Sequence, residues 1–188
     1  MVSVLSRHGL KRDYKRMDHI SSNLKLAVLC GEDQLFADHN GFDFESIEKA
    51  MKHNRKSKSL RGASTISQQT AKNVFLWQHG GYFRKGLEVY FTFLIEKIWG
   101  KKRILEVYLN VAEMGDGVFG AEAAAHKYFN KNAAILTSRE SAMIAACLPN
   151  PKEYTIFPLS RRVASRSLWI QQQMKNLEED PDIQDLIN

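Results

Sequence analysis

The sequence predicts a nearly all-α fold. Apolar residues recur at helical spacing in one segment after another, and no segment alternates apolar and polar residues as a half-buried strand does. Stop signals such as Gly100 and the run 149–151 separate these segments. With 188 residues, the chain is long enough for one domain with a substantial core or for two small lobes.

The first expected helices follow a basic lead-in. Residues 1–20 carry several lysines and arginines with little periodicity, so we expect a loosely ordered segment there. Ser21 or Ser22 can cap a helix that runs toward Glu32, and Asp43 can cap the helix after it.

Residues 32–43 bring acids, a histidine, aromatics and glycine together directly after the apolar run 24–29. An apolar helix end can hold the carboxylate of Glu32 away from water, which would raise its pKa and make it a usable general base or acid. The alternative is an ordinary helix end with a solvated acidic turn.

A polar helix is expected to begin at about residue 64. An exposed helix face is normally rich in Glu and Lys, whereas this one presents hydroxyls, amides and a lysine: Ser64, Thr65, Gln68, Gln69, Lys72 and Asn73. Such groups suit hydrogen bonds to sugar hydroxyls, and the lysine suits a phosphate. The alternative is a buried polar network between helices.

A long helix should run over residues 82–99. Its segment 89–95 is apolar nearly all round, which predicts a central and largely buried helix. Arg84 and Glu88 are one helical turn apart near its start, with Lys85 alongside. An exposed pair of this kind stabilises by only tenths of a kcal/mol, so charges at the mouth of a buried helix are better candidates for function.

The C-terminal half continues with helices. They are expected over residues 104–110, 121–129, 141–148 and 160–177, and the four residues 137–140 have the capping-box pattern for the third of them. The tail beyond them looks frayed. The expected organisation is therefore a basic lead-in over 1–20, one domain over 21–178 and a frayed tail over 179–188.

Composition limits the partners and the cellular setting. The net charge of +6 favours anionic partners, namely nucleic acid, acidic lipid or phosphorylated substrates. The basic stretch 52–61 is either a contact for anionic lipid or phosphate or a solvated loop. Cys30 and Cys147 belong to no metal-spaced cluster and are interpreted as buried thiols. No apolar run approaches the roughly 20 residues of a membrane span.

Several motifs stand in one order along the chain: Glu32-Asp33-x-x-Phe36-x-x-His39-x-Gly41-x-Asp43, Gly62-x-Ser64-Thr65-Ile66-Ser67-Gln68-Gln69-x-x-Lys72-Asn73, Arg84-Lys85-x-x-Glu88, Arg103-Ile104-Leu105-Glu106-x-Tyr108-Leu109-Asn110 and Gly117-x-x-Gly120-x-Glu122-Ala123-Ala124-Ala125-x-x-Tyr128-Phe129. Together they resemble the peptidoglycan glycosyltransferases, the transglycosylase family of penicillin-binding proteins, and most closely the monofunctional biosynthetic form. The resemblance extends over about residues 21–169. It implies a lysozyme-like helical fold, with a larger lobe and a smaller, membrane-facing lobe around a cleft.

The resemblance implies a bacterial enzyme of cell wall biogenesis and cell shape. It would polymerise lipid II into β-1,4-linked glycan strands, with inversion and release of undecaprenyl pyrophosphate. Its partners would be lipid II, the growing strand, the membrane surface and other cell-wall synthesis enzymes, with no nucleic acid. It would act on the periplasmic or outer face of the cytoplasmic (inner) membrane. The family's membrane helix and a transpeptidase domain are not expected within this chain.

The resemblance also assigns roles to residues. Glu32 is the general base and Glu88 the second catalytic acid, placed near the pyrophosphate, where it can hold a divalent cation such as Mg²⁺ or Mn²⁺ or orient the basic groups. No organic cofactor is implied. The substrate path takes Asp33, His39, Ser64, Thr65, Gln68, Gln69, Lys72, Asn73, Arg84 and Lys85, of which Asp33 and His39 support Glu32 rather than react. Glu106 and Asn110 are expected to be structural.

Two other functions fit part of the pattern. A lysozyme-like glycan hydrolase could use Glu32 and Glu88 as a paired acid and base. An inactive module could bind anionic lipid through the basic surface alone. The basic groups Lys72 and Arg84 favour the transferase over the hydrolase, because a neutral leaving sugar does not need them.

Overall fold

The structure is a computed structural model and describes residues 13–57, 62–77 and 80–188. Its elements are η1 (Met17–His19), α1 (Ser22–Glu32), α2 (Phe44–Lys56), α3 (Ile66–Phe75), α4 (Tyr82–Ile98), α5 (Gly100–Val111), β1 (Glu113–Gly115), β2 (Val118–Phe119), α6 (Ala121–Phe129), η2 (Ala133–Ile135), α7 (Ser138–Cys147), α8 (Arg161–Leu177) and α9 (Pro181–Ile187). Helices dominate, so the predicted fold class is confirmed.

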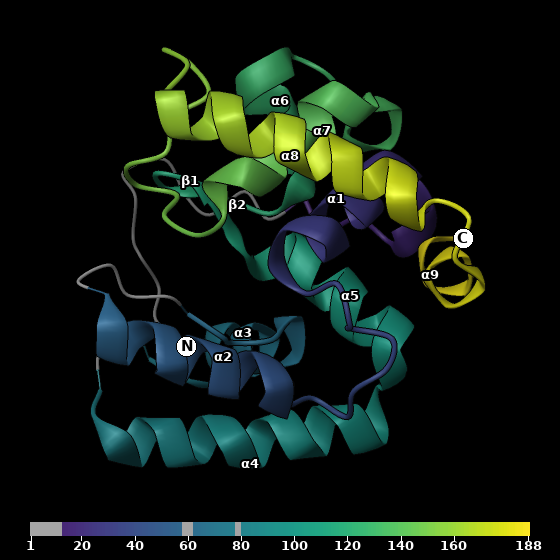
Figure 1. The fold of residues 1–188 in the computed structure, drawn as a ribbon. Coiled ribbons are helices and arrows are strands. Elements are labelled where there is room, and N and C mark those ends of the chain that lie inside the picture. Colours follow the sequence, from purple (N-terminus) through teal and green to yellow (C-terminus); the bar gives the residue numbers. More distant parts are fainter. Residues whose placement is uncertain (1–12, 58–61, 78–79) are drawn as a thin grey trace.

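The helices form two lobes joined by α5 (Figure 1). The larger lobe holds α1 and α6 to α9, and the smaller lobe holds α2, α3 and α4. Helix α5 contacts α3 and α4 on one side and α6 and α9 on the other. A residue at the end of α1 or α3 that lies toward the other lobe is therefore placed where the two lobes meet.

Helix α1 is the centre of the larger lobe. Ser21 caps its start by accepting a hydrogen bond from the backbone N–H of Asn23. Leu24, Val28 and Leu29 are fully buried, and the helix packs against α7, α8 and α9. This packing fixes the position of Glu32, the last residue of α1.

The lead-in is ordered over residues 13–20, contrary to the expectation of a loose segment. The backbone N–H of Lys15 donates to Asn110 Oδ1 at 2.7 Å, and Asn110 Nδ2 donates to the carbonyl of Lys15 at 2.9 Å. The N–H of Met17 donates to Glu106 Oε2 at 2.9 Å. Glu106 and Asn110 are therefore structural, as predicted. The rest of the lead-in lies outside the described residues.

A small hairpin interrupts the helices, although no strand was expected. Strands β1 and β2 pair antiparallel around Asp116 and Gly117, and the φ of Gly117 is 68°. An Asp-Gly pair is a strong hairpin signal because the turn needs positive φ. The strands are too short to show an alternating pattern, which is why the sequence analysis missed them.

Helix α4 is less buried than predicted. Only Glu88, Thr92 and Ile95 among its residues are buried, whereas most of its aromatic side chains are exposed, namely Tyr82, Phe83, Tyr90 and Phe93. The expectation of a central, buried helix is therefore wrong, because an apolar composition was taken as burial. In the described part of the chain, no helix is long and apolar enough to cross a bilayer.

The basic stretch after residue 51 is partly helical, since α2 continues to Lys56. The residues of this stretch at 58–61 lie outside the described residues, so its lipid or phosphate contact stays a prediction. Lys52 pairs with Glu48 one turn earlier at 2.6 Å on the exposed face of α2. The described part of the stretch is thus an exposed basic helix end rather than a loop.

Both cysteines are buried free thiols, as predicted. Burial raises the pKa of Cys30 and of Cys147 to about 12. Because the thiolate is the reactive form, neither cysteine is a nucleophile at neutral pH.

The C-terminal tail forms α9, so the expected fraying is wrong. Asp180 caps this helix, and Pro181 occupies its first turn. Ile183, Leu186 and Ile187 are buried against the larger lobe. Residues 179–188 were expected to be frayed, although an Asp-Pro pair such as Asp180-Pro181 is also a helix start signal.

We predict that Leu186→Ala destabilises the fold, because Leu186 is only 5% exposed. A buried Leu→Ala change costs about 2 to 4 kcal/mol. The matched control is Leu168→Ala on α8, where the leucine is 68% exposed. Urea unfolding measures both variants, and equal stability losses would contradict the docking of α9.

Candidate active site

Glu32 lies where α1 meets α3. Its Oε2 accepts a hydrogen bond of 2.9 Å from Nε2 of Gln69, which belongs to α3 of the smaller lobe. One side chain from each lobe thus meets at the residue that the sequence analysis identified as the base.

The environment of Glu32 favours its neutral form. Burial raises the pKa of Glu32, and the charge of Asp33 adds to this rise. The hydrogen bond from Gln69 and the positive charges of Arg166 and Lys72 act against it without cancelling it. A carboxyl with a raised pKa is a stronger base once it is ionised, and this property is typical of catalytic acids and bases.

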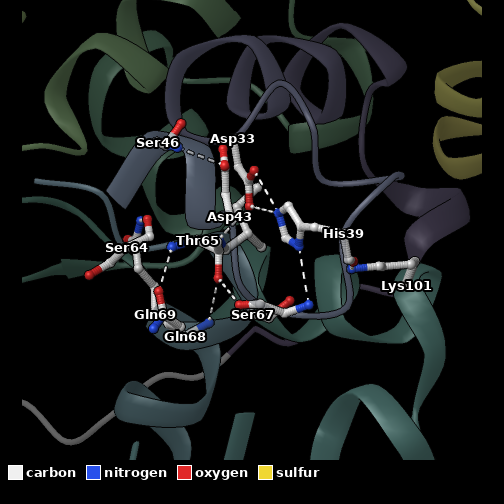
Figure 2. A network of polar contacts seen from close by, with 12 residues as sticks. Asp33, His39, Asp43, Ser46, Ser64, Thr65, Ser67, Gln68, Gln69 and Lys101 are labelled. Carbon is white, nitrogen blue, oxygen red and sulfur yellow. Dashed lines mark hydrogen bonds and ion pairs between the residues drawn. The ribbon is translucent and has the colours of Figure 1, made fainter. Parts of the chain in front are cut away.

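Asp33 contacts His39 and the start of α3, and so holds the chain that follows α1 (Figure 2). Asp33 Oδ1 and Oδ2 lie 3.0 and 3.1 Å from Nε2 of His39. Asp33 Oδ2 also accepts a hydrogen bond of 2.9 Å from the backbone N–H of Ile66, the first residue of α3. A carboxylate at a helix N-terminus is stabilising. Asp33 therefore ties the end of α1 to the start of α3.

His39 completes this link. Its Nδ1 accepts a hydrogen bond of 3.1 Å from the N–H of Gly41, so Nε2 carries the proton toward Asp33. The carbonyl of Gly41 accepts from Thr65 Oγ1 at 2.7 Å. Gly41 has φ +87°, and a Cβ there would lie 2.8 Å from Thr92 Cγ2. Asp33 and His39 thus hold the loop that follows α1, and their supporting role toward Glu32 stays a prediction.

A half-buried ion pair anchors the same loop from the other side. Lys101 Nζ donates to the carbonyl of His39 at 2.5 Å and to Glu96 Oε1 at 2.7 Å. Glu96 Oε1 also accepts from Ser67 Oγ at 2.5 Å. Figure 2 shows Lys101 reaching the loop beside His39. The sequence analysis missed Glu96 and Lys101, because neither stands out until the helices α4 and α5 are placed.

The polar side chains at the start of α3 and along it fall into two groups, those that are buried and cap the helix and those that a ligand could reach. Thr65 and Gln68 form a capping box at the start of α3, and both are buried. Their assignment to the substrate path is therefore corrected, and the alternative of a buried network holds for these two residues. Gln69 and Lys72 are half-buried, and Ser64 and Asn73 are exposed.

A second charged group lies at the start of α4. Glu88 is 3% exposed, and its Oε2 lies 3.3 Å from Arg84 Nη1 while its Oε1 pairs with Lys85 Nζ. The buried Nε of Arg84 has no hydrogen-bond partner among the described residues. A buried donor without an acceptor is unusual in proteins, so this cluster is suited to an anionic ligand.

Lys72 links the two groups. Burial lowers the pKa of Lys72, the negative charges of Glu88 and Glu32 raise it, and the positive charges of Arg84 and Lys85 lower it. Lys72 therefore interacts with the base and with the cluster on α4. That these residues form one site stays a prediction, which the charge interactions of Lys72 support.

The residues near Glu88 do not form a metal cage by themselves. Both oxygens of Glu88 face cationic side chains. The described residues contain no group of three or more His, Cys, Asp or Glu side chains that could hold a metal ion. Mg²⁺ is commonly held by one or two carboxylates together with substrate phosphates. The divalent cation stays a prediction that depends on the substrate, and we derive no step through it.

Arg166 is a further residue that the sequence analysis missed. Its Nη2 donates to the carbonyl of Gly31 at 3.0 Å, and its guanidinium stacks 3.8 Å from the ring centroid of Trp169. Nothing in the pattern of α8 marks an arginine that reaches the end of α1. Its charge acts on Glu32 across the packed helices.

A cavity of about 580 Å³ lies elsewhere, beside the junction of α4 and α5 and next to α9. Its lining includes Trp99, Lys102 and Asp185 but neither Glu32 nor Glu88. We place the candidate site by its chemistry, at Glu32, and not by this cavity.

A helical architecture, an acid with a raised pKa and a cationic cluster fit a glycosyl-transferring site, and comparison with known proteins agrees. The model of the transglycosylase family matches residues 1–175. The chain therefore belongs to this family, and the family resemblance of the motifs is confirmed.

Individual relatives support the same assignment. A biosynthetic peptidoglycan transglycosylase of Pseudomonas syringae pv. syringae is 51% identical over 94% of this chain and 75% of its own length. Relatives of the same name from Aeromonas hydrophila and Escherichia coli are each 53% identical, over 89% and 95% of this chain and 72% and 74% of their own lengths.

We predict that Asp33→Asn destabilises the protein. In either orientation the NH₂ group of the asparagine faces an N–H donor, that of His39 or that of Ile66, in place of an acceptor. This mismatch in a buried site costs about 1 to 3 kcal/mol. Asp38→Asn is the control, since Asp38 is exposed. Urea unfolding of both variants checks this, and an unchanged midpoint for Asp33→Asn would refute the tie between α1 and α3.

Proposed function

We propose that this chain polymerises lipid II, with Glu32 as the general base and the Lys72, Arg84 and Lys85 cations at the leaving pyrophosphate. Family membership supports glycosyl transfer in peptidoglycan biosynthesis. The substrate, the inverting mechanism and the roles of the residues are our inference from the chemistry of the site.

On the acceptor side, Glu32 takes the proton of the 4-hydroxyl of an N-acetylglucosamine unit. A sugar hydroxyl is a weak nucleophile, so a positioned base accelerates its attack by roughly 10² to 10⁴. The oxygen attacks the anomeric carbon of the donor N-acetylmuramic acid from the face opposite the leaving group. The configuration therefore changes from α to β as the new bond forms.

On the donor side, the bond to undecaprenyl pyrophosphate breaks and negative charge develops on the phosphate oxygens. Positive groups that are already in place stabilise such a charge without rearranging. Lys72, Arg84 and Lys85 supply these groups, and Glu88 holds Arg84 and Lys85 in position. When phosphate arrives, the unpaired Nε of Arg84 gains an acceptor.

The observation that carries the proposal is the position of Lys72. It lies close enough to Glu32 and to Glu88 for its charge to interact with both, which supports a single site that holds the base and the cationic cluster. A hydrolase would release a neutral sugar and would have no use for three cations on that side. An attacking hydroxyl at Glu32 and a leaving phosphate at the cluster match a lipid-linked sugar donor.

We further propose that the smaller lobe rests on the membrane that carries this substrate. Helix α4 buries the charged Glu88 and exposes aromatic side chains, with Tyr82 99% exposed. Phe83, Tyr90 and Phe93 are exposed as well. Exposed apolar groups of this density mark an interaction surface, and a lipid interface suits tyrosine and phenylalanine.

We predict that Glu32→Gln loses polymerisation of lipid II by at least about 10² and retains its binding, because the amide cannot accept the hydroxyl proton. Gel analysis of the glycan products measures the rate. Glu153→Gln, at an exposed position, is the control. Full activity of Glu32→Gln would eliminate Glu32 as the base, and shortening of pre-made glycan by the wild type would favour a hydrolase.

Lys72→Met should lower kcat of polymerisation by about 100-fold, because the developing phosphate charge loses a stabilising cation. Lys152→Met, at an exposed position, should leave kcat unchanged. Steady-state kinetics on lipid II separates kcat from KM. A change in KM alone would mean that Lys72 binds the substrate without acting in the transition state.

The double variant Tyr82→Ser/Phe83→Ser should bind phosphatidylglycerol vesicles several-fold more weakly than the wild type, since it loses apolar surface on α4. Leu168→Ser is the matched control, because Leu168 is exposed on the larger lobe. Vesicle sedimentation measures binding. Equal losses in both variants would contradict a membrane face on α4.

A further inference from the structure

The side-chain amide of Gln69 has hydrogen-bond partners at both of its ends. Its Nε2 donates to Glu32 Oε2 at 2.9 Å and to the carbonyl of Ser64 at 3.4 Å. Its Oε1 accepts from the hydroxyl of Tyr108 at 3.2 Å. Three elements, α1, α3 and α5, therefore meet at this amide.

Tyr108 is fully buried in α5. Within the described part of the chain, Gln69 is the hydrogen-bond partner of its hydroxyl. Burial, together with the nearby charges of Glu32 and Asp33, raises the pKa of Tyr108 well above its usual value. The hydroxyl therefore keeps its proton and acts as a donor.

This donor decides which way the amide of Gln69 faces. After a half-turn of the amide, its oxygen would face the carboxylate of Glu32 and the carbonyl of Ser64. The hydroxyl proton of Tyr108 would then lose its acceptor in a buried site, where an unpaired donor is costly. The tyrosine thus opposes the reversed orientation from the side opposite Glu32.

We propose that Tyr108 is a positioning residue: its hydroxyl holds the amide of Gln69 with the NH₂ group toward Glu32, and so fixes the carboxylate of the base. Only the catalytic consequence rests on the proposed function, namely on Glu32 being the base. The two hydrogen bonds from Tyr108 to Gln69 and from Gln69 to Glu32, called the relay below, do not depend on the proposed function.

The expected pH effect has a definite sign. The charges of Arg166 from α8, Lys72 from α3 and Asp33 beside the end of α1 act on Glu32, and Tyr108→Phe changes none of these charges. The hydrogen bond from Gln69 lowers the pKa of Glu32, while burial raises it. Loss of a well-oriented amide therefore raises the pKa further. A base works in its ionised form, so the acidic limb of the rate profile should move to higher pH.

The test follows the carboxyl of Glu32 directly. Protein labelled with ¹³C at the glutamate carboxyls is titrated by NMR, and the resonance of Glu32 is assigned by its loss in Glu32→Gln. We expect the titration midpoint to rise in Tyr108→Phe and in Gln69→Leu. The double variant Tyr108→Phe/Gln69→Leu should titrate like Gln69→Leu, because both changes break the same relay.

The control is Tyr128→Phe, a half-buried tyrosine of α6 whose hydroxyl lies over Gly115. It removes the same atom and should leave the midpoint of Glu32 unchanged. An unchanged midpoint in Tyr108→Phe, or effects of Tyr108→Phe and Gln69→Leu that add in the double variant, would overturn the relay.

The kinetic arm measures kcat/KM for lipid II against pH. For Tyr108→Phe we expect a loss of roughly three- to tenfold on the acidic limb, and rates within about twofold of the wild type on the plateau. A purely structural defect would lower the rate at every pH. If the NMR midpoint moves and the rate profile does not, the relay stands and Glu32 as the base is wrong.

Two further variants distinguish loss of the hydroxyl donor from a general packing or folding defect. Tyr108→4-fluorophenylalanine fills the volume of the hydroxyl and supplies no donor, so it should give the same midpoint as Tyr108→Phe. Tyr108→4-aminophenylalanine supplies a donor again and should restore the wild-type midpoint. Failure of this rescue, in a protein that melts like the wild type, would also overturn the proposal.

Discussion

The hydrogen bond between Gln69 and Glu32 is the contact on which the arrangement of the site depends, because it joins the two lobes at the base. Helix α1 brings Glu32 to this point through its buried packing in the larger lobe. Asp33 brings Gln69 there by holding the first N–H of α3. The acid beside the base is thus an element of structure, and the motif Glu32-Asp33 serves two separate purposes.

Helix α4 distributes its charged and apolar side chains in the opposite way from a usual surface helix. It turns Glu88 inward, where Arg84 and Lys85 pair with it, and turns its aromatic side chains outward. A charged interior and an apolar exterior fit a lobe that binds phosphate on one side and lipid on the other. If the smaller lobe rests on a membrane as proposed, the apolar residues of segment 89–95 serve contact with lipid and not burial in a protein core.

Local features of the fold were predictable from sequence. Asp43 caps α2 as expected, and Thr137 forms the capping box that begins α7, because such bonds join residues only a few positions apart. The ordered lead-in and α9 were not predictable, since Asn110 and Lys25 hold them across the fold. In the site, motif residues such as Glu32 and Lys72 were identified by type and spacing. Arg166 and Lys101 act through tertiary contacts that spacing does not reveal, and Thr65 and Gln68 have the same side chains whether they cap a helix or bind a sugar.

The most direct test of the account is a structure of this protein bound to a non-reactive lipid II analogue and an acceptor sugar. We expect the pyrophosphate to form ion pairs with Lys72 and Arg84, and the 4-hydroxyl of the acceptor to lie within hydrogen-bond distance of Glu32. A pyrophosphate bound away from these cations, or an acceptor hydroxyl out of reach of Glu32, would contradict the account.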